Sequence, residues 1–182
     1  HAEVYLCMRA FLCRFASQHL TGFWPIILTE MVRILAQAKV DLPADKSDRL
    51  QLVFSVVKLA DFLITLQTDD FQIYQWLFIT DTPDATNPAS FYMADSLLDC
   101  LAKFVSECER ELVFDANDSL ERAQQRRPLL QMSSVTTVST LQPFFATASR
   151  AFYECDFHAT LDWDNINSCL LCDLFEPIRT NA

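Results

Sequence analysis

Long apolar segments crossed by narrow polar stripes dominate the first part of the chain. Nearly every position between Glu3 and Gln18 is apolar, and the polar positions recur at helical spacing, which predicts a helix buried on more than one side. A second helix is expected from Pro25 to about Val40, because proline suits the first turn of a helix. Its polar residues form one stripe: Thr29, Glu30, Arg33 and Gln37.

A third helix is predicted after a proline break at Pro43. Ser47 or Asp48 is the natural N-cap, and the apolar periodicity runs to about Gln67. All three helices have a large apolar arc, which is typical of layered helix packing. We expect the polar stripe of the third helix to face water; it consists of Gln51, Ser55, Lys58 and Thr65.

The rest of the chain predicts shorter helices separated by loops. The expected helices span residues 71–79, 89–109, 136–155 with a break or kink near Pro143, and 162–175, with a helical turn or two at 120–127. Mobile loops are expected at 80–88 and at 111–134. The fold class is therefore all-α, either an α-solenoid fragment of HEAT-like units or an irregular helical bundle. We expect residues 1–182 to form a single helical module of a longer chain.

Glycine is nearly absent, because Gly22 is the single glycine in 182 residues. Loops that hold phosphates or dinucleotides need several glycines, since the backbone must approach the ligand closely. Walker and Rossmann sites are thereby excluded, and no cofactor is expected. Gly22 lies in a predicted corner between the first two helices, which is made of Leu20, Thr21, Gly22, Trp24 and Pro25.

The formal net charge is −10, which repels nucleic acid and anionic lipid surfaces. The charge is uneven, because residues 1–64 hold seven basic and six acidic side chains, whereas residues 65–182 hold seven and eighteen. A nucleic acid partner is therefore not expected, and a protein with a basic surface fits better. Charged residues interrupt the most apolar segments, so no transmembrane segment is predicted.

Seven cysteines form an odd set that lies mostly within apolar helical patterns, where free cysteine behaves as a small buried hydrophobe. This pattern indicates a reducing, cytoplasmic compartment. The chain opens on His1, and its first residues lack the basic-then-apolar order of a signal peptide. We therefore expect a part excised from a longer protein.

Four residues near the C-terminus have the types and spacing of a zinc site. Cys155 and His158 are followed by Cys169 and Cys172, which would complete a tetrahedral set if the loop between them folds back. Alternatively, the i, i+3 spacing of Cys169 and Cys172 places both thiols in a core. We favour this second interpretation and expect no metal site.

Catalytic constellations are weak in this sequence. His19 and His158 are the internal histidines, and no strained turn presents a serine or cysteine nucleophile beside a base. Acidic pairs such as Asp69 and Asp70 suit solvated helix ends better than acid–base chemistry. We therefore expect no enzymatic activity.

Arg122, Arg126 and Arg127 form the one basic cluster of the sequence. Guanidinium groups at this spacing would grip a phosphoinositide headgroup or an acidic peptide. Glu121 dilutes the cluster, so a solvated helix face is the favoured interpretation.

Three segments resemble the C-terminal region of the Dopey family: Gln18 to Val32, Lys58 to Leu63 and Phe71 to Ile79. The Leu-Thr-x-x-Trp-Pro corner at Leu20 to Pro25 is the most specific element, and the similar motifs cover roughly residues 1–80. The family consists of very large cytosolic proteins that act as scaffolds in traffic between endosomes and the Golgi. The resemblance therefore implies a non-enzymatic scaffold or adaptor module, cytoplasmic and peripheral on Golgi and endosome membranes.

The resemblance also implies partners. Family members are associated with a large scaffold that resembles Arf exchange factors, with kinesin, and with phosphatidylinositol 4-phosphate. The expected function is a protein-interaction surface in membrane traffic. The alternative is a module that binds phosphoinositide headgroups through the arginine cluster.

Overall fold

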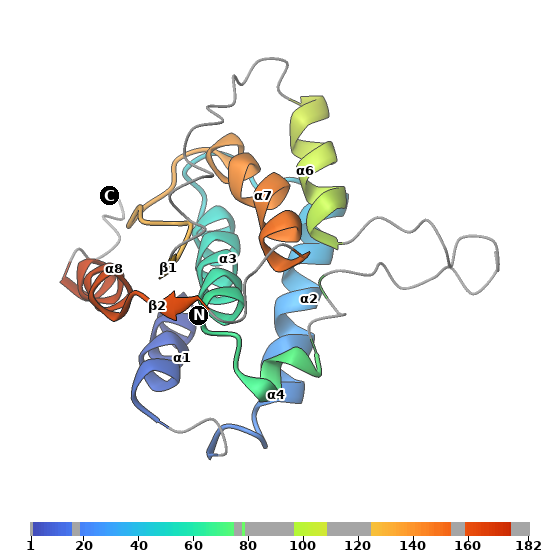
Figure 1. Ribbon diagram of the computed structural model, residues 1–182. Helices are drawn as coiled ribbons and strands as arrows, with labels where there is room; N and C mark the ends of the chain where they lie inside the picture. The colour runs from blue at the N-terminus through green and yellow to red at the C-terminus, as the bar shows by residue number, and fades with distance from the viewer. Residues whose placement is uncertain are drawn as a thin grey trace, which may run out of the picture.

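The computed structural model describes residues 2–15, 19–74, 78, 97–108, 125–153 and 159–175. Helices dominate these residues, so the predicted all-α class is confirmed (Figure 1). The helices are α1 (Ala2–Arg14), α2 (Trp24–Val40), α3 (Asp48–Leu66), α4 (Asp69–Gln72), α6 (Leu97–Cys108), the 3₁₀ helix η5 (Val138–Leu141), α7 (Gln142–Tyr153) and α8 (Trp163–Phe175). Two short strands, β1 (Gln125–Arg126) and β2 (Thr160–Leu161), pair in parallel.

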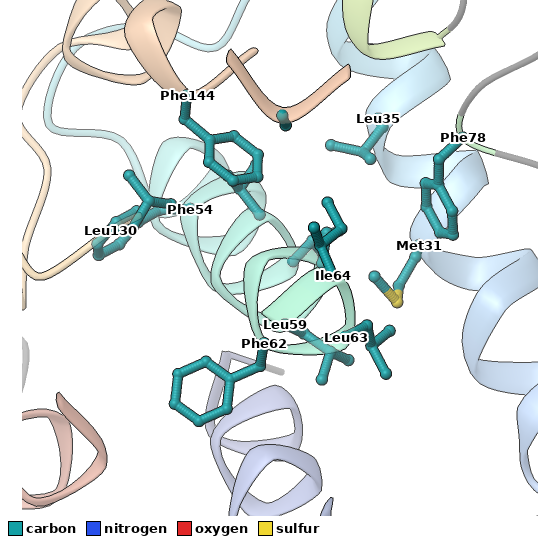
Figure 2. Close-up of a cluster of buried hydrophobic side chains, with 14 of the residues drawn as sticks. Met31, Leu35, Phe54, Leu59, Phe62, Leu63, Ile64, Phe78, Leu130 and Phe144 are labelled. Atoms are coloured by element: carbon teal, nitrogen blue, oxygen red, sulfur yellow. The ribbon is translucent and has the colours of Figure 1, made fainter. Parts of the chain in front are cut away.

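α3 runs through the middle of the structure, with α1, α2 and α7 packed against it (Figure 1). Every residue from Val53 to Leu66 is buried. In Figure 2, Phe62 lies on the side of α1, and Phe144 reaches in from α7. Met31 and Leu35 approach from α2. The expectation of a helix covered on more than one side is therefore confirmed for α3.

The packing order of the helices distinguishes the two expected architectures. α6 contacts both α2 and α7, and α1 contacts α3 and α8. A solenoid restricts contacts to neighbouring repeats, whereas here segments far apart in the chain surround one central helix. The arrangement is that of an irregular helical bundle.

The corner between α1 and α2 is set by buried side chains rather than by its glycine. Leu20 and Trp24 are buried, and the backbone N–H of Phe23 donates to the carbonyl of Leu20 at 2.9 Å. Pro25 lies in the first turn of α2, as predicted. Gly22 does not have a positive φ, and a Cβ added to it would meet nothing within 4 Å. The corner therefore does not require glycine.

Local signals predict both ends of α3 correctly. The Ser47 side chain caps the helix, because its Oγ accepts the backbone N–H of Leu50 at 3.1 Å. At the other end Gln67 takes the left-handed conformation with φ 47°, and its N–H donates to the carbonyl of Leu63 at 2.9 Å. Pro143 likewise marks a break, because η5 gives way to α7 at Gln142.

The helical turn predicted at 120–127 is wrong where the structure describes it. Residues 125 and 126 form β1, with Gln125 opposite Thr160 and Arg126 opposite Leu161. The partner strand lies more than thirty residues further along the chain, so the local sequence pattern does not indicate the pairing. Residues 80–88 and 111–124 of the predicted mobile loops, and 89–96 of a predicted helix, lie outside the described residues.

Candidate functional site

The polar stripe of α3, expected to face water, is buried. Ser55, Lys58 and Thr65 are all less than a tenth exposed, and Gln51 is half-buried. The prediction was wrong because residues 129–135 and α8, which come late in the chain, make polar contacts along this stripe. Residues from the C-terminal third of the chain therefore pack along this stripe of α3.

Hydrogen bonds connect residues 129–135 to this side of α3. The carboxylate of Asp61 accepts the backbone N–H groups of Leu129 at 3.0 Å and of Leu130 at 2.8 Å. Further along the helix, Nε2 of Gln51 donates to the carbonyl of Val135 at 2.7 Å. Each of these bonds satisfies a group that burial would otherwise leave without water.

Three buried charges join α1, α3 and α8. Lys58 Nζ donates to the two carboxylate oxygens of Asp173 at 2.5 and 2.7 Å, and Nη1 of Arg9 donates to the same carboxylate. The three side chains are only 2–6% exposed. Burial lowers the pKa of Lys58 below its ordinary 10.5, although the hydrogen bond to Asp173 opposes this shift. No local pattern in the sequence indicates this cluster, because its members come from distant segments.

α1 presents an apolar row to solvent. Val4 is 58% exposed, Phe11 44% and Phe15 55%. Phe15 directly follows α1, and its N–H still donates to the carbonyl of Phe11 at 2.8 Å. Seven and four residues separate the three, so they follow one face of the helix, and the rings of Phe11 and Phe15 meet edge to face at 5.4 Å. We call Val4, Phe11 and Phe15 the outer row. The first helix is contacted by both α3 and α8, and its buried side chains, Tyr5, Arg9 and Leu12, lie on a different side from the outer row.

Part of the predicted arginine cluster is engaged inside the protein. Arg126 is half-buried, with Nε donating to the carbonyl of Ala159 at 3.0 Å and Nη1 to Oε1 of Gln67 at 3.4 Å. Arg127 is also half-buried, and Arg122 lies outside the described residues. The Arg126 side chain thus connects β1 by hydrogen bonds to the residue before β2 and to the residue after α3. Headgroup binding by the cluster stays a prediction.

Two of the four candidate zinc ligands, Cys155 and His158, lie outside the described residues. The other two lie on α8, where Cys169 is buried and Cys172 is exposed. The alternative that placed both thiols in the core is therefore wrong for Cys172. The Cys169 thiol donates to Oδ1 of Asn165 at 3.6 Å, and burial raises its pKa. Within the described ranges no group of three or more His, Cys, Asp or Glu could hold a metal ion.

The sequence model described as DOP1 C-terminal matches residues 1–158. The chain belongs to the DOP1 C-terminal family. The predicted resemblance to the Dopey family is thereby confirmed, and its span is longer than the 80 residues on which it was based. In the described part of the chain no helix is both long and apolar enough to cross a membrane.

Curated relatives of the DOP1 family match over most of the chain. Protein DOP1B of Xenopus laevis is 26% identical over 183 residues, which cover 83% of this chain and 8% of that protein. Protein pad-1 of Caenorhabditis elegans is 29% identical over 159 residues, 80% of this chain and 6% of that protein. Protein dop1 of Emericella nidulans is 33% identical over 101 residues, which cover 54% of this chain and 5% of that protein. The chain spans less than a tenth of these relatives, and no solved structure matches it significantly.

Proposed function

We propose that this chain is a non-enzymatic scaffold module of membrane traffic between endosomes and the Golgi, and that the outer row of α1 is its protein-docking surface. It acts in the cytoplasm, peripheral to Golgi and endosome membranes. Family membership supports the trafficking role. The exposed phenylalanines of the outer row carry the proposal for the surface.

The outer row has the chemistry of a protein contact. Aromatic side chains are enriched in the centres of interfaces and supply most of the binding energy there. The rings of Phe11 and Phe15 pack edge to face in the free chain, so their side chains have little conformational freedom left to lose on binding. Val4 extends the row by two further turns.

The partner we propose is the large scaffold that resembles Arf exchange factors. The net charge of −10 opposes insertion of the row into an anionic bilayer and favours a protein with basic residues around an apolar contact. Kinesin is a second candidate of the same class. Neither a nucleic acid nor a cofactor is part of the proposal.

Direct binding of phosphatidylinositol 4-phosphate is the alternative. It is less well supported, because two donors of Arg126 are used within the protein. Liposome flotation with vesicles that contain this lipid tests it. Flotation that falls for Arg127→Glu would favour the alternative, whereas flotation that is absent or unchanged would remove it.

Binding of the purified Arf-exchange-factor-like scaffold to the immobilised chain tests the proposal. The double variant Phe11→Gln/Phe15→Gln should bind at least about tenfold more weakly than the wild type, since two aromatic anchors are lost. Ile26→Gln on α2, where the side chain is 72% exposed, is the matched control and should bind normally. Equal binding of all three chains would contradict the proposed surface.

Light scattering of the same chains separates a protein partner from a second copy. The proposal predicts the same mass for the wild type and the double variant. A wild-type dimer that the double variant converts into a monomer would assign the outer row to self-association instead.

A further inference from the structure

Arg9 and Lys58 form, with Phe62 and Phe54, a buried cationic site that we call the dibasic site. The Arg9 guanidinium lies 5.4 Å from the ring centre of Phe62, and Nζ of Lys58 lies 5.3 Å from that of Phe54. Aromatic faces attract cations strongly once water is removed. α1 and α3 contact each other directly, so the four side chains come from two helices already packed together.

A single carboxylate accepts hydrogen bonds from both cations in this site. Asp173 of α8 accepts from Arg9 and from Lys58, whereas Nε of Arg9 is buried with no acceptor among the described residues. Buried cations that lack acceptors are costly. The α1–α3 pair therefore favours an anion at this position, whichever segment supplies it.

α8 meets the site with the spacing of a helix that binds as a ligand. Its buried side chains are Ile166, Cys169 and Leu170, and Asp173 follows one turn later. Positions i, i+3, i+4 and i+7 are the anchors by which a single helix docks on a protein surface. Figure 1 shows α8 at the edge of the molecule beside α1.

Two further features separate α8 from the bundle. The family match ends at residue 158, whereas α8 begins at Trp163. Toward its C-terminal end α8 exposes Leu171, Leu174 and Phe175, whereas its first turns expose Asp164 and Ser168. A helix of the core normally has its apolar side chains covered, so the uncovered apolar side chains of α8 fit a segment that is bound at the edge of the bundle.

We propose that the dibasic site is a binding site for an apolar helix that carries a carboxylate seven residues after its first anchor, and that α8 occupies it reversibly in cis. A second helix with the sequence of α8 competes for the same site. The tether keeps the chain's own α8 at an effective concentration of about millimolar. The competing helix therefore binds well only when the contact in cis is weakened.

A labelled peptide of residues 159–175 tests the proposal in an anisotropy titration against the full 182-residue chain. The chain variant Asp173→Asn has lost the anchor in cis and should bind the wild-type peptide at least about tenfold more tightly than the wild-type chain does. The peptide variant Asp173→Asn should bind neither chain. Asp164→Asn, which changes the exposed acid in the first turn of α8, is the matched control and should behave as wild type in either component.

A folded Asp173→Asn chain that does not bind the wild-type peptide would overturn the proposal. Tight binding of the Asp173→Asn peptide would overturn it as well, because the carboxylate would then have no part in recognition.

Hydrogen exchange of the wild-type chain keeps the proposal testable if the Asp173→Asn chain does not fold. A reversibly bound α8 opens on its own, so its amides should exchange at least about tenfold faster than those of α3. Excess wild-type peptide should accelerate exchange in α8 further, and the Asp173→Asn peptide should not. Equal protection of α8 and α3, unchanged by peptide, would show that α8 is an integral part of the core.

Discussion

Asp61 shows how much of this structure depends on single polar side chains. It is buried in the middle of α3, and its two carboxylate oxygens receive the backbone N–H groups of Leu129 and Leu130. These bonds hold residues 129 and 130, which lie in neither a helix nor a strand, against the central helix. The Asp61 carboxylate thus satisfies the N–H groups of residues 129 and 130, as backbone carbonyls do within helices and sheets.

Replacing Asp61 by asparagine should destabilise the chain. An amide offers one acceptor oxygen where the carboxylate offers two, so one buried N–H would lose its partner at a cost of about 1–3 kcal/mol. Urea denaturation should show this loss, whereas Asp45→Asn in the exposed turn before α3 should change the free energy of unfolding very little. Equal stability of the two variants would mean that the Asp61 contacts are not maintained in solution.

Gly22→Ala should leave the chain as stable as the wild type or more stable. The Cβ meets no atom within 4 Å, and φ is not positive, so the folded state accepts alanine without strain. The unfolded chain loses backbone freedom, which stabilises the fold by about 0.4–1 kcal/mol. Thermal denaturation checks this, and a lower melting temperature would show that the corner does need glycine.

Lys58 should give the free energy of unfolding a measurable pH dependence. Its pKa lies below 10.5 in the folded chain because burial disfavours the charged form. In the pH range just below 10.5 the unfolded chain therefore binds more of this proton, and the contribution of Lys58 to stability rises with pH. Denaturation at several pH values should show the wild type gaining stability relative to Lys58→Met in that range. A difference that is constant with pH would contradict the buried position of Lys58.

At the scale of the elements, helix ends could be predicted from the sequence, whereas contacts between segments far apart in the chain could not. The Ser47 cap, the Pro25 start and the Pro143 break rest on residues close to the helix end that they define. The polar stripe of α3 was misinterpreted, because Lys58 meets its partner 115 residues further along the chain. The β1–β2 pairing was missed for the same reason. Local patterns report which positions are polar, but not which distant segment satisfies them.

The two sides of α1 should differ sharply in their effect on stability. Leu12 is 8% exposed and belongs to the core, so Leu12→Ala should cost about 2–5 kcal/mol. Phe11→Gln, next to it on the outer row, should change stability by no more than about 0.5 kcal/mol, because exposed substitutions rarely exceed this value. Urea denaturation of both variants checks the contrast. A loss at Phe11 as large as that at Leu12 would mean that the row is covered within the chain.

At the scale of the whole molecule, an apolar bundle carries a net charge of −10 and exposes an aromatic row on its first helix. The candidate surface was only partly predictable. The sequence showed that α1 is apolar almost all round, but only the packing reveals which of its sides α3 and α8 cover. The single glycine excludes Walker and Rossmann loops, and the proposed function to test is recognition of a protein partner.

Site-specific photo-crosslinking from the outer row tests whether this surface contacts the proposed partner. Benzoylphenylalanine replaces Phe11 in cells that contain the Arf-exchange-factor-like scaffold, and the control carries it at Ile26, which is exposed on α2. If the outer row is the docking surface, position 11 crosslinks to that scaffold and position 26 does not. Crosslinks from position 11 to lipid alone, to a second copy of the chain, or to no protein at all would contradict it.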